Sequence, residues 1–226
     1  METQCSIMDI ISALGSIILA ILAIWGRSIK TFFYKPKLSF SINTTNDSCV
    51  ECIEAQSNDS NVEKELQVRL KLINKGNETA MDTISVVEEV YKQGGDGKFF
   101  LYKEYMPYSL VFHQSRKSKQ HIIPKLSYYI EIAKVKCWQS NTMLREPGTN
   151  KSNHKLYLKI DEERISLVEL GSGTFIVPIK TYYRCAKSPI ITYVWLFWDG
   201  DNSTVELKSK FTAQLKTNKE FRNLIK

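Results

Sequence analysis

Residues Ile7 to Trp25 form the longest apolar stretch of the chain and limit most strongly what it can fold into. After Asp9 the stretch carries no ionisable side chain until Arg27, and its apolar residues surround the expected helix. Such a helix has no solvated face to offer a soluble core. At 1.5 Å per residue it would be about 28 Å long, close to the hydrocarbon thickness of a bilayer. The sequence therefore predicts a single transmembrane helix.

The charges that flank this stretch predict its orientation. Glu2 and Asp9 precede it, whereas a group of basic residues follows: Arg27, Lys30, Lys35 and Lys37. Basic residues beside a span tend to stay in the cytoplasm. We therefore expect a single-pass protein of the bacterial inner membrane, with its N-terminus outside and the rest cytoplasmic. A cleaved signal peptide is the alternative, but the basic leader and small-x-small cleavage site that it needs are missing.

Small residues recur along one side of the expected helix. Ser12, Ser16 and Ala20 are spaced four residues apart, and Gly15 lies beside them. Small residues at this spacing let another helix pack closely in a membrane. The alternative is that such residues are simply common in membrane helices. A homo-oligomer is expected if the protein conducts ions, because one helix cannot line a pore.

Composition narrows the choice of partners. About 190 of the 226 residues follow the helix, enough for one β domain or two small ones. The net charge of +7 favours an anionic partner such as lipid headgroups, nucleic acid or a nucleotide. The odd number of cysteines fits a reducing compartment better than a disulfide framework. Cys49 and Cys52 have the spacing of half a zinc site, but no second pair follows, so neither a metal nor a cofactor is expected.

Short segments of period-two alternation follow one another from Leu38 onward and predict an all-β fold. Residues 43–65 are polar and are expected to form a loop, with at most a short strand at Cys49–Ile53. Pro178 predicts an edge strand or a bulge, and the apolar run Ile190–Trp198 predicts a central strand. We therefore expect an immunoglobulin-like β-sandwich over residues 36–217. The anchor would occupy residues 1–35, and a short amphipathic tail residues 218–226.

The sequence predicts no enzyme, because it lacks a phosphate-binding loop, a nucleophile elbow and a zinc-protease motif. A hydrolase whose residues come from distant strands is the alternative, since a catalytic triad need not show in sequence.

One basic segment has the composition of an anion-binding site. Its candidate ligand-binding residues are His113, Arg116, Lys117, Lys119 and His121. Lysine, arginine and histidine bind phosphates, and four neighbouring aromatic residues could stack on bases: Tyr108, Phe112, Tyr128 and Tyr129. The alternative is a solvated loop beside core aromatic residues.

Three short motifs carry a resemblance that spans most of the chain. They are Pro36-Lys37-Leu38, Leu72-Ile73-Asn74-Lys75-Gly76 with Ala80 and Asp82, and Met106-Pro107-Tyr108-Ser109-Leu110-Val111-Phe112 before Ile122-Ile123-Pro124. With the preceding helix they make the chain resemble bacterial membrane-anchored immunoglobulin-like β-sandwich proteins. Its architecture and charge are also similar to those of membrane effectors of antiphage defence systems (Hailong-like).

This resemblance implies a function for the chain. A cytosolic sensor module would bind a nucleotide or oligonucleotide, and its assembled helices would open or depolarise the membrane. An enzyme encoded nearby is a possible source of that ligand. A static anchor that recruits a partner protein is the alternative, and a nucleotide hydrolase is a second one.

Overall fold

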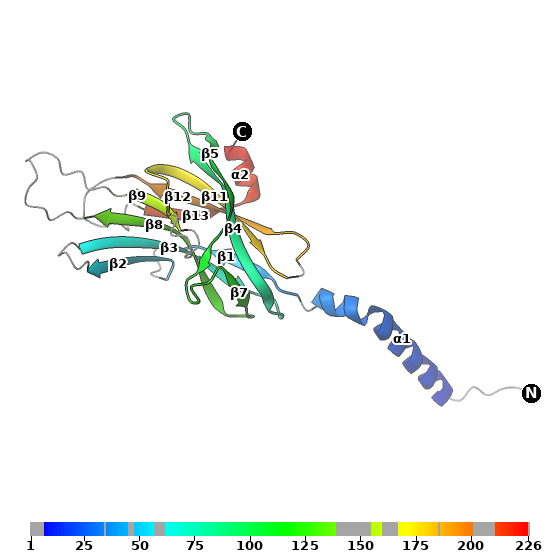
Figure 1. Ribbon diagram of the computed structural model, residues 1–226. Coiled ribbons are helices and arrows are strands. Elements are labelled where there is room, and N and C mark those ends of the chain that lie inside the picture. The colour runs from blue at the N-terminus through cyan, green and yellow to red at the C-terminus, as the bar shows by residue number, and fades with distance from the viewer. Residues whose placement is uncertain are drawn as a thin grey trace, which may run out of the picture.

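The computed structural model describes residues 7–33, 35–44, 48–56, 62–138, 155–159, 167–184, 186–200 and 211–225, and Figure 1 shows their arrangement. The elements are α1 (Ile7–Phe33), β1 (Leu38–Ser41), β2 (Val50–Gln56), β3 (Val62–Asn74), β4 (Ala80–Gln93), β5 (Phe99–Ser109), β6 (Val111–Phe112), β7 (Lys119–Ile122), β8 (Ser127–Trp138), β9 (Lys155–Lys159), β10 (Leu167–Glu169), β11 (Gly173–Tyr182), β12 (Ile190–Trp198), β13 (Phe211–Lys216) and α2 (Asn218–Leu224).

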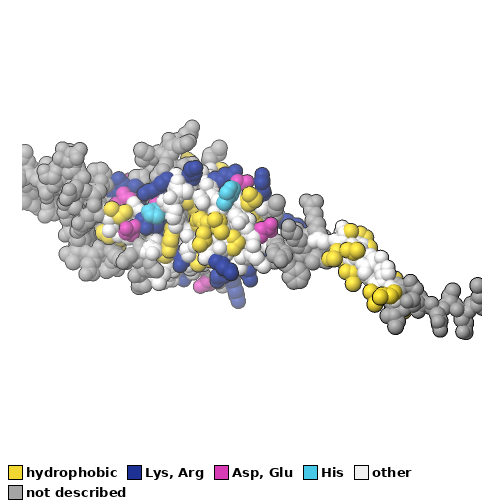
Figure 2. Space-filling view, turned by 90° about the horizontal axis from the view of Figure 1, so that it is seen from below, with side chains coloured by type: hydrophobic (Ala, Val, Ile, Leu, Met, Phe, Trp, Pro, Cys, Tyr) yellow, Lys and Arg dark blue, Asp and Glu magenta, His cyan; other side chains and the backbone are white. Residues whose placement is uncertain are grey.

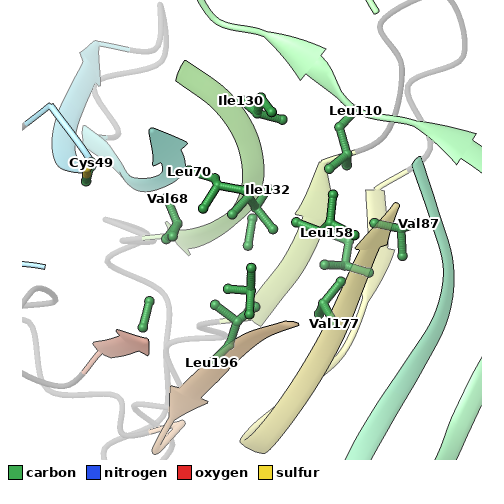
Figure 3. Close-up of a cluster of buried hydrophobic side chains, with 14 of the residues drawn as sticks. Cys49, Val68, Leu70, Val87, Leu110, Ile130, Ile132, Leu158, Val177 and Leu196 are labelled. Atoms are coloured by element: carbon green, nitrogen blue, oxygen red, sulfur yellow. The ribbon is translucent and has the colours of Figure 1, made fainter. Parts of the chain in front are cut away.

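The strands form two sheets that pack around one apolar core. The first sheet has the order β1-β3-β8-β9-β10, with β2 and β6 at its margins, and the second has the order β13-β12-β11-β4-β5, with β7 beside β4. Neighbouring strands are antiparallel in both. Figure 3 shows side chains of both sheets meeting between them, among them Leu70, Ile132, Val177 and Leu196. The predicted mainly β fold is therefore confirmed.

Alternation explains which side chains enter the core. In β3, Leu66 to Leu72 bury every second side chain completely, whereas the residues between them point outward. In β8 the register against β3 shifts between Val68 and Arg69, which marks a β-bulge. The bulge lets Ile132 and Ala133 both be buried although they are adjacent.

The loop predicted for residues 43–65 was wrong in part, whereas the short strand predicted at Cys49–Ile53 corresponds to β2. β3 begins at Val62 and pairs with β2 within the region expected to be a loop, because backbone pairing between the two strands decides the structure there. β11 is not an edge strand, since it lies between β12 and β4. Pro178 is accommodated by a register shift against β4 between Ile176 and Ile179, so the alternative of a bulge was correct.

The predicted transmembrane span is also wrong. In the part of the chain that the structure describes, no helix is both long and apolar enough to cross a membrane. The single-pass inner-membrane location and the orientation inferred from Arg27, Lys30, Lys35 and Lys37 are overturned with it.

The buried amide of Asn74 joins the segment after α1 to the sandwich. Its Oδ1 accepts hydrogen bonds from the backbone N–H groups of Lys37 and Gly76, each at 3.0 Å. Its Nδ2 donates to the carbonyl oxygens of Glu78 at 2.7 Å and Ile122 at 3.0 Å. All four hydrogen bonds that an asparagine amide can comfortably make are therefore formed. Asn74 fixes the entry of the chain into β1 against both the β3–β4 turn and β7.

Gly76 makes room for this entry, and its substitution gives a first prediction. A Cβ atom at Gly76 would lie 2.2 Å from the Lys35 carbonyl oxygen and 2.7 Å from the Lys37 nitrogen. Because both neighbours are backbone atoms, Gly76→Ala should displace residues 35–37 and break the Asn74 contact. We expect the free energy of unfolding to fall by about 2 kcal/mol. Gly95→Ala is the control, because its Cβ would meet nothing within 4 Å. Equal stability of the two variants in urea denaturation would contradict this packing.

Helix α2 is attached to the outer face of the second sheet by one aromatic residue. Phe221 is buried, stacks on Tyr193 with ring centroids 4.3 Å apart, and meets Tyr91 edge-on at 5.2 Å. A capping box starts the helix: Thr217 Oγ1 accepts from the Glu220 N–H, and the Glu220 carboxylate accepts from the Thr217 N–H at 2.6 Å. The predicted amphipathic tail is therefore a docked helix.

The capping box predicts a pH dependence for α2. Hydrogen bonds from the Thr217 backbone and side chain hold the pKa of Glu220 below its ordinary value of 4.5. Since the folded form has the lower pKa, this stabilisation is present above pH 4.5 and is lost as the pH falls through the folded value. Amide exchange in residues 218–224 should therefore accelerate in acid relative to the core strands. Glu220→Gln should remove this pH dependence, and its persistence would contradict the assignment.

Candidate functional site

The five residues predicted to form one anion site belong to two separate groups. His113 and Arg116 lie in the turn between β6 and β7, over the first sheet, and contact a buried carboxylate. Lys119 and His121 lie in β7 and face a different carboxylate, that of Asp82. The basic segment therefore does not act as a single cluster.

The first group is centred on Glu131, whose side chain is only 2% exposed. His113 Nδ1 lies 2.6 Å from Glu131 Oε1, and Arg116 Nη1 donates to the same oxygen at 3.4 Å. Arg116 adopts a left-handed backbone conformation with φ of 55°, which is uncommon for a non-glycine residue. These contacts fold the turn over β8, and we name the three residues the Glu131 lock.

Glu131 is buried although it lies on the outer face of the first sheet. Glu131 pairs with Arg69 across the β3–β8 ladder, so both side chains point to the same outer face. Arg69 is also buried and donates to Glu51 at 2.5 Å and to Gln67 at 2.7 Å. Opposite charges thus lie close together where water is largely excluded.

The Glu131 lock does not support the hydrolase alternative. Ser115, His113 and Glu131 are the residue types of a hydrolytic triad, but the Ser115 Oγ makes no hydrogen bond to a described residue and is fully buried. A nucleophile must be reached by substrate and must contact its base. The geometry of these three residues meets neither condition.

The second group surrounds Asp82 at the margin of the second sheet. Lys119 Nζ lies 3.1 Å from Asp82 Oδ1, and Arg184 Nε lies 3.5 Å from Asp82 Oδ2. His121 Nδ1 accepts a hydrogen bond from the Asp82 N–H at 3.0 Å, which leaves Nε2 to carry the proton of the neutral ring. More than half of each of the Lys119, Arg184 and His121 side chains is exposed, so all three are open to a ligand.

A β-bulge places Asp82 at this position. The register between β4 and β7 shifts between Ala80 and Thr83, and Asp82 has a φ of 53°, a conformation that aspartate tolerates better than most residues. The buried Thr83 hydroxyl closes the bulge by donating to the Ala80 carbonyl oxygen at 3.0 Å. Arg184 is fixed by its own N–H, which donates to the Met81 carbonyl oxygen at 2.8 Å.

The local charge remains positive after these ion pairs form. A hydrogen bond from Lys119, aided by the charges of Lys119, Arg184 and His121, holds the pKa of Asp82 below its ordinary value against a smaller effect of burial. The ionised Asp82 balances only one of its cations. Lys117 adds another at the same hollow, which measures about 440 Å³. We name this site the basic hollow; it comprises Asp82, Lys117, Lys119, Gln120, His121 and Arg184.

Figure 2 shows how mixed the charges are on this side of the sandwich: each histidine in view has both basic and acidic side chains beside it.

Asp82, Arg184 and Glu131 were missed in the sequence because they come from distant segments. A signal existed for Glu131, which is the only charged residue within Tyr128–Ala133. An isolated charge in an apolar strand indicates a buried partner.

The aromatic residues expected to stack on bases do not serve that purpose. Phe112 and Tyr128 are buried, and Tyr108 and Tyr129 pack against the core from partly buried positions. The Tyr128 hydroxyl accepts a hydrogen bond from the Ile123 N–H at 3.3 Å. Their apolar packing explains the error, because core and stacking aromatics have the same sequence pattern.

The paired cysteines do not form a redox pair or half a metal site. Cys49 is buried and Cys52 is exposed, and no disulfide joins them. Within the described ranges no three histidine, cysteine or acidic residues are grouped closely enough to hold a metal ion.

Comparisons of the chain with protein-family models, with curated proteins and with solved structures found no match.

Proposed function

We propose that the sandwich is a binding module for a phosphate-bearing ligand, which it recognises at the basic hollow. The observation that carries this proposal is the excess of exposed cations around one ionised carboxylate. Lys119 and Arg184 contact Asp82 from opposite oxygens, and Lys117 opens onto the same hollow without an ion pair to any described residue. A phosphate supplies the missing negative charge.

Asp82 has an orienting role in this proposal. Long lysine and arginine side chains lose conformational freedom when they bind a ligand, and this loss weakens binding. Contacts with Asp82 hold Lys119 and Arg184 in place beforehand. A phosphate then joins the cations as a second acceptor, and the His121 Nε2–H donates to it.

The chemistry of the hollow favours phosphate over base recognition. The described lining residues include no aromatic side chain, so a nucleobase has no ring to stack on there. A nucleotide or a single-stranded nucleic acid would therefore be bound through its backbone, with little dependence on base sequence.

The module is proposed to bind rather than to catalyse. Pore opening required a spanning helix, so it is not carried forward from the sequence expectations. The immunoglobulin-like classification, the resemblance to antiphage effectors and the scaffold alternative stay predictions that no comparison tests.

Calorimetric titration of the full chain with sodium tripolyphosphate and with an oligothymidylate tests the proposal. We expect both to bind, and the affinity for the oligothymidylate to fall steeply between about 50 mM and about 200 mM salt. The double variant Lys119→Gln/Arg184→Gln should weaken binding about tenfold or more and lower the salt slope by roughly two.

The matched control removes the same charge elsewhere. Lys98→Gln/Lys219→Gln alters the β4–β5 turn and α2, and it should leave both affinities nearly unchanged. Equal weakening by the two double variants would mean that only net charge matters. Affinity that is indifferent to salt would contradict phosphate recognition outright.

A further inference from the structure

Helix α1 carries a large apolar surface that the rest of the described chain does not cover. Its large apolar side chains are between 48% and 74% exposed: Met8, Ile10, Ile11, Leu14, Ile17, Ile18, Leu19, Ile21, Leu22, Ile24 and Trp25. Figure 2 shows apolar side chains on the described surface of α1, and Figure 1 shows α1 extending away from both sheets. Soluble proteins rarely leave so large an apolar patch uncovered.

The segment that follows α1 is held against the sandwich, while α1 itself is left uncovered by the described chain. Asn74 and Gly76 hold the backbone of residues 35–37 against the β3–β4 turn. A Cβ atom at Gly15 or Gly26 would meet nothing within 4 Å, so the described residues leave both positions open.

The large side chains are distributed unevenly around the helix axis. At about 100° per residue they occupy an arc of roughly 220°, whose middle contains Leu14, Ile18 and Ile21. The remaining sector holds the small residues Ser12, Ala13, Ser16, Ala20 and Ala23. The Ser16 hydroxyl donates to the Ser12 carbonyl oxygen at 2.9 Å, so it is satisfied within its own helix. The wide arc, and not the small sector, requires a partner.

We propose that α1 assembles with the α1 helices of further copies of the chain, in a bundle of at least three. Identical helices match each other in length and in apolar surface, so copies of α1 can cover one another completely. The exposed side chains of the arc amount to on the order of 1,000 Å² per copy, which exceeds the about 800 Å² per partner of a typical stable interface. A single neighbour covers only a narrow seam, whereas a 220° arc needs neighbours on two sides.

This proposal places the packing surface of α1 on the opposite side of the helix from the one that the sequence predicts. Small residues were expected to form the packing surface because they do so between helices in lipid. In an aqueous bundle the large apolar residues point inward, and Ser12, Ser16 and Ala20 face water.

Sedimentation velocity of the full chain without detergent tests the assembly. The wild type should sediment as three or more copies of the 26.1 kDa chain. Ile18→Asp/Ile21→Asp places two charges in the middle of the arc and should give monomers. The matched control Ser16→Asp/Ala20→Asp adds the same charge to the small sector and should remain assembled. Amide hydrogen exchange of the core strands β3 and β8 should be the same for all three proteins, which shows that the sandwich stays folded.

Two results would overturn the proposal. In the first, the wild type is monomeric, or the small-sector variant dissociates while the arc variant does not. In the second, the wild type floats with phosphatidylcholine vesicles as a monomer and Ile18→Asp/Ile21→Asp does not float, which would show that lipid covers the arc. Since phosphate binding at the basic hollow is measured separately, failure of either proposal leaves the other testable.

Discussion

Asn74→Asp is expected to destabilise the protein by about 4 kcal/mol, a large part of the roughly 5–15 kcal/mol that a folded domain has. Asn74 is completely buried, and its Nδ2 donates to the carbonyl oxygens of Glu78 and Ile122. In the variant a carboxylate oxygen would replace Nδ2, and it could donate no hydrogen bond to these two carbonyl oxygens. Each unsatisfied acceptor costs about 1–3 kcal/mol, and burial of the new charge adds to that cost.

Asn77→Asp is the matched control for this prediction. It introduces the same change in the same turn, but Asn77 is exposed, so stability should change by no more than about 0.5 kcal/mol. Urea denaturation followed by tryptophan fluorescence measures both variants. A loss below about 1 kcal/mol for Asn74→Asp would show that the amide does not hold the chain entry as described.

Removal of the buried carboxylate of Glu131 should have the second largest effect. Glu131→Ala leaves His113 and Arg116 without their acceptor and leaves the buried Arg69 opposite an apolar side chain. Breaking a buried ion pair by removing one partner costs about 3–5 kcal/mol. Because the side chains of His113 and Arg116 are partly exposed, we expect a loss of stability near the lower end, about 3 kcal/mol. Proteolytic cleavage within the turn 113–118 should accelerate in parallel.

A double-mutant cycle separates the contact from the general effect of the substitution. Combining Glu131→Ala with His113→Ala should give a coupling energy of at least about 1 kcal/mol, because the two side chains are in direct contact. Glu104→Ala removes an exposed carboxylate of β5 and should cost less than about 0.5 kcal/mol. Additive losses in the cycle would refute the Glu131 lock.

Local pattern predicted the strands but not all of their boundaries. The continuous apolar run predicted the central strand Ile190–Trp198, in which the consecutive residues Thr192, Tyr193 and Val194 are all buried. Period-two alternation missed the first residues of β3, where the charged residues Glu63, Lys64 and Glu65 follow one another and pairing with β2 decides the structure. Tertiary pairing of this kind has no counterpart in the local sequence.

The candidate site was predictable in composition but not in arrangement. The sequence identified every basic residue between His113 and His121, yet their carboxylate partners lie in β4 and β8. Asp82 reaches Lys119 only because a bulge turns it, and a bulge is a property of strand register. The division of one basic segment between the Glu131 lock and the basic hollow therefore required the structure.

Histidine-ring NMR of the full chain during titration with tripolyphosphate tests this division most directly. The chain has three histidines, and the signals of His113 and His121 can be assigned by single substitutions to glutamine. We predict that the ring signals of His121 shift progressively while those of His113, which is bound to Glu131, stay in place. Equal shifts of both rings, or a shift of His113 alone, would contradict the assignment of phosphate binding to the basic hollow.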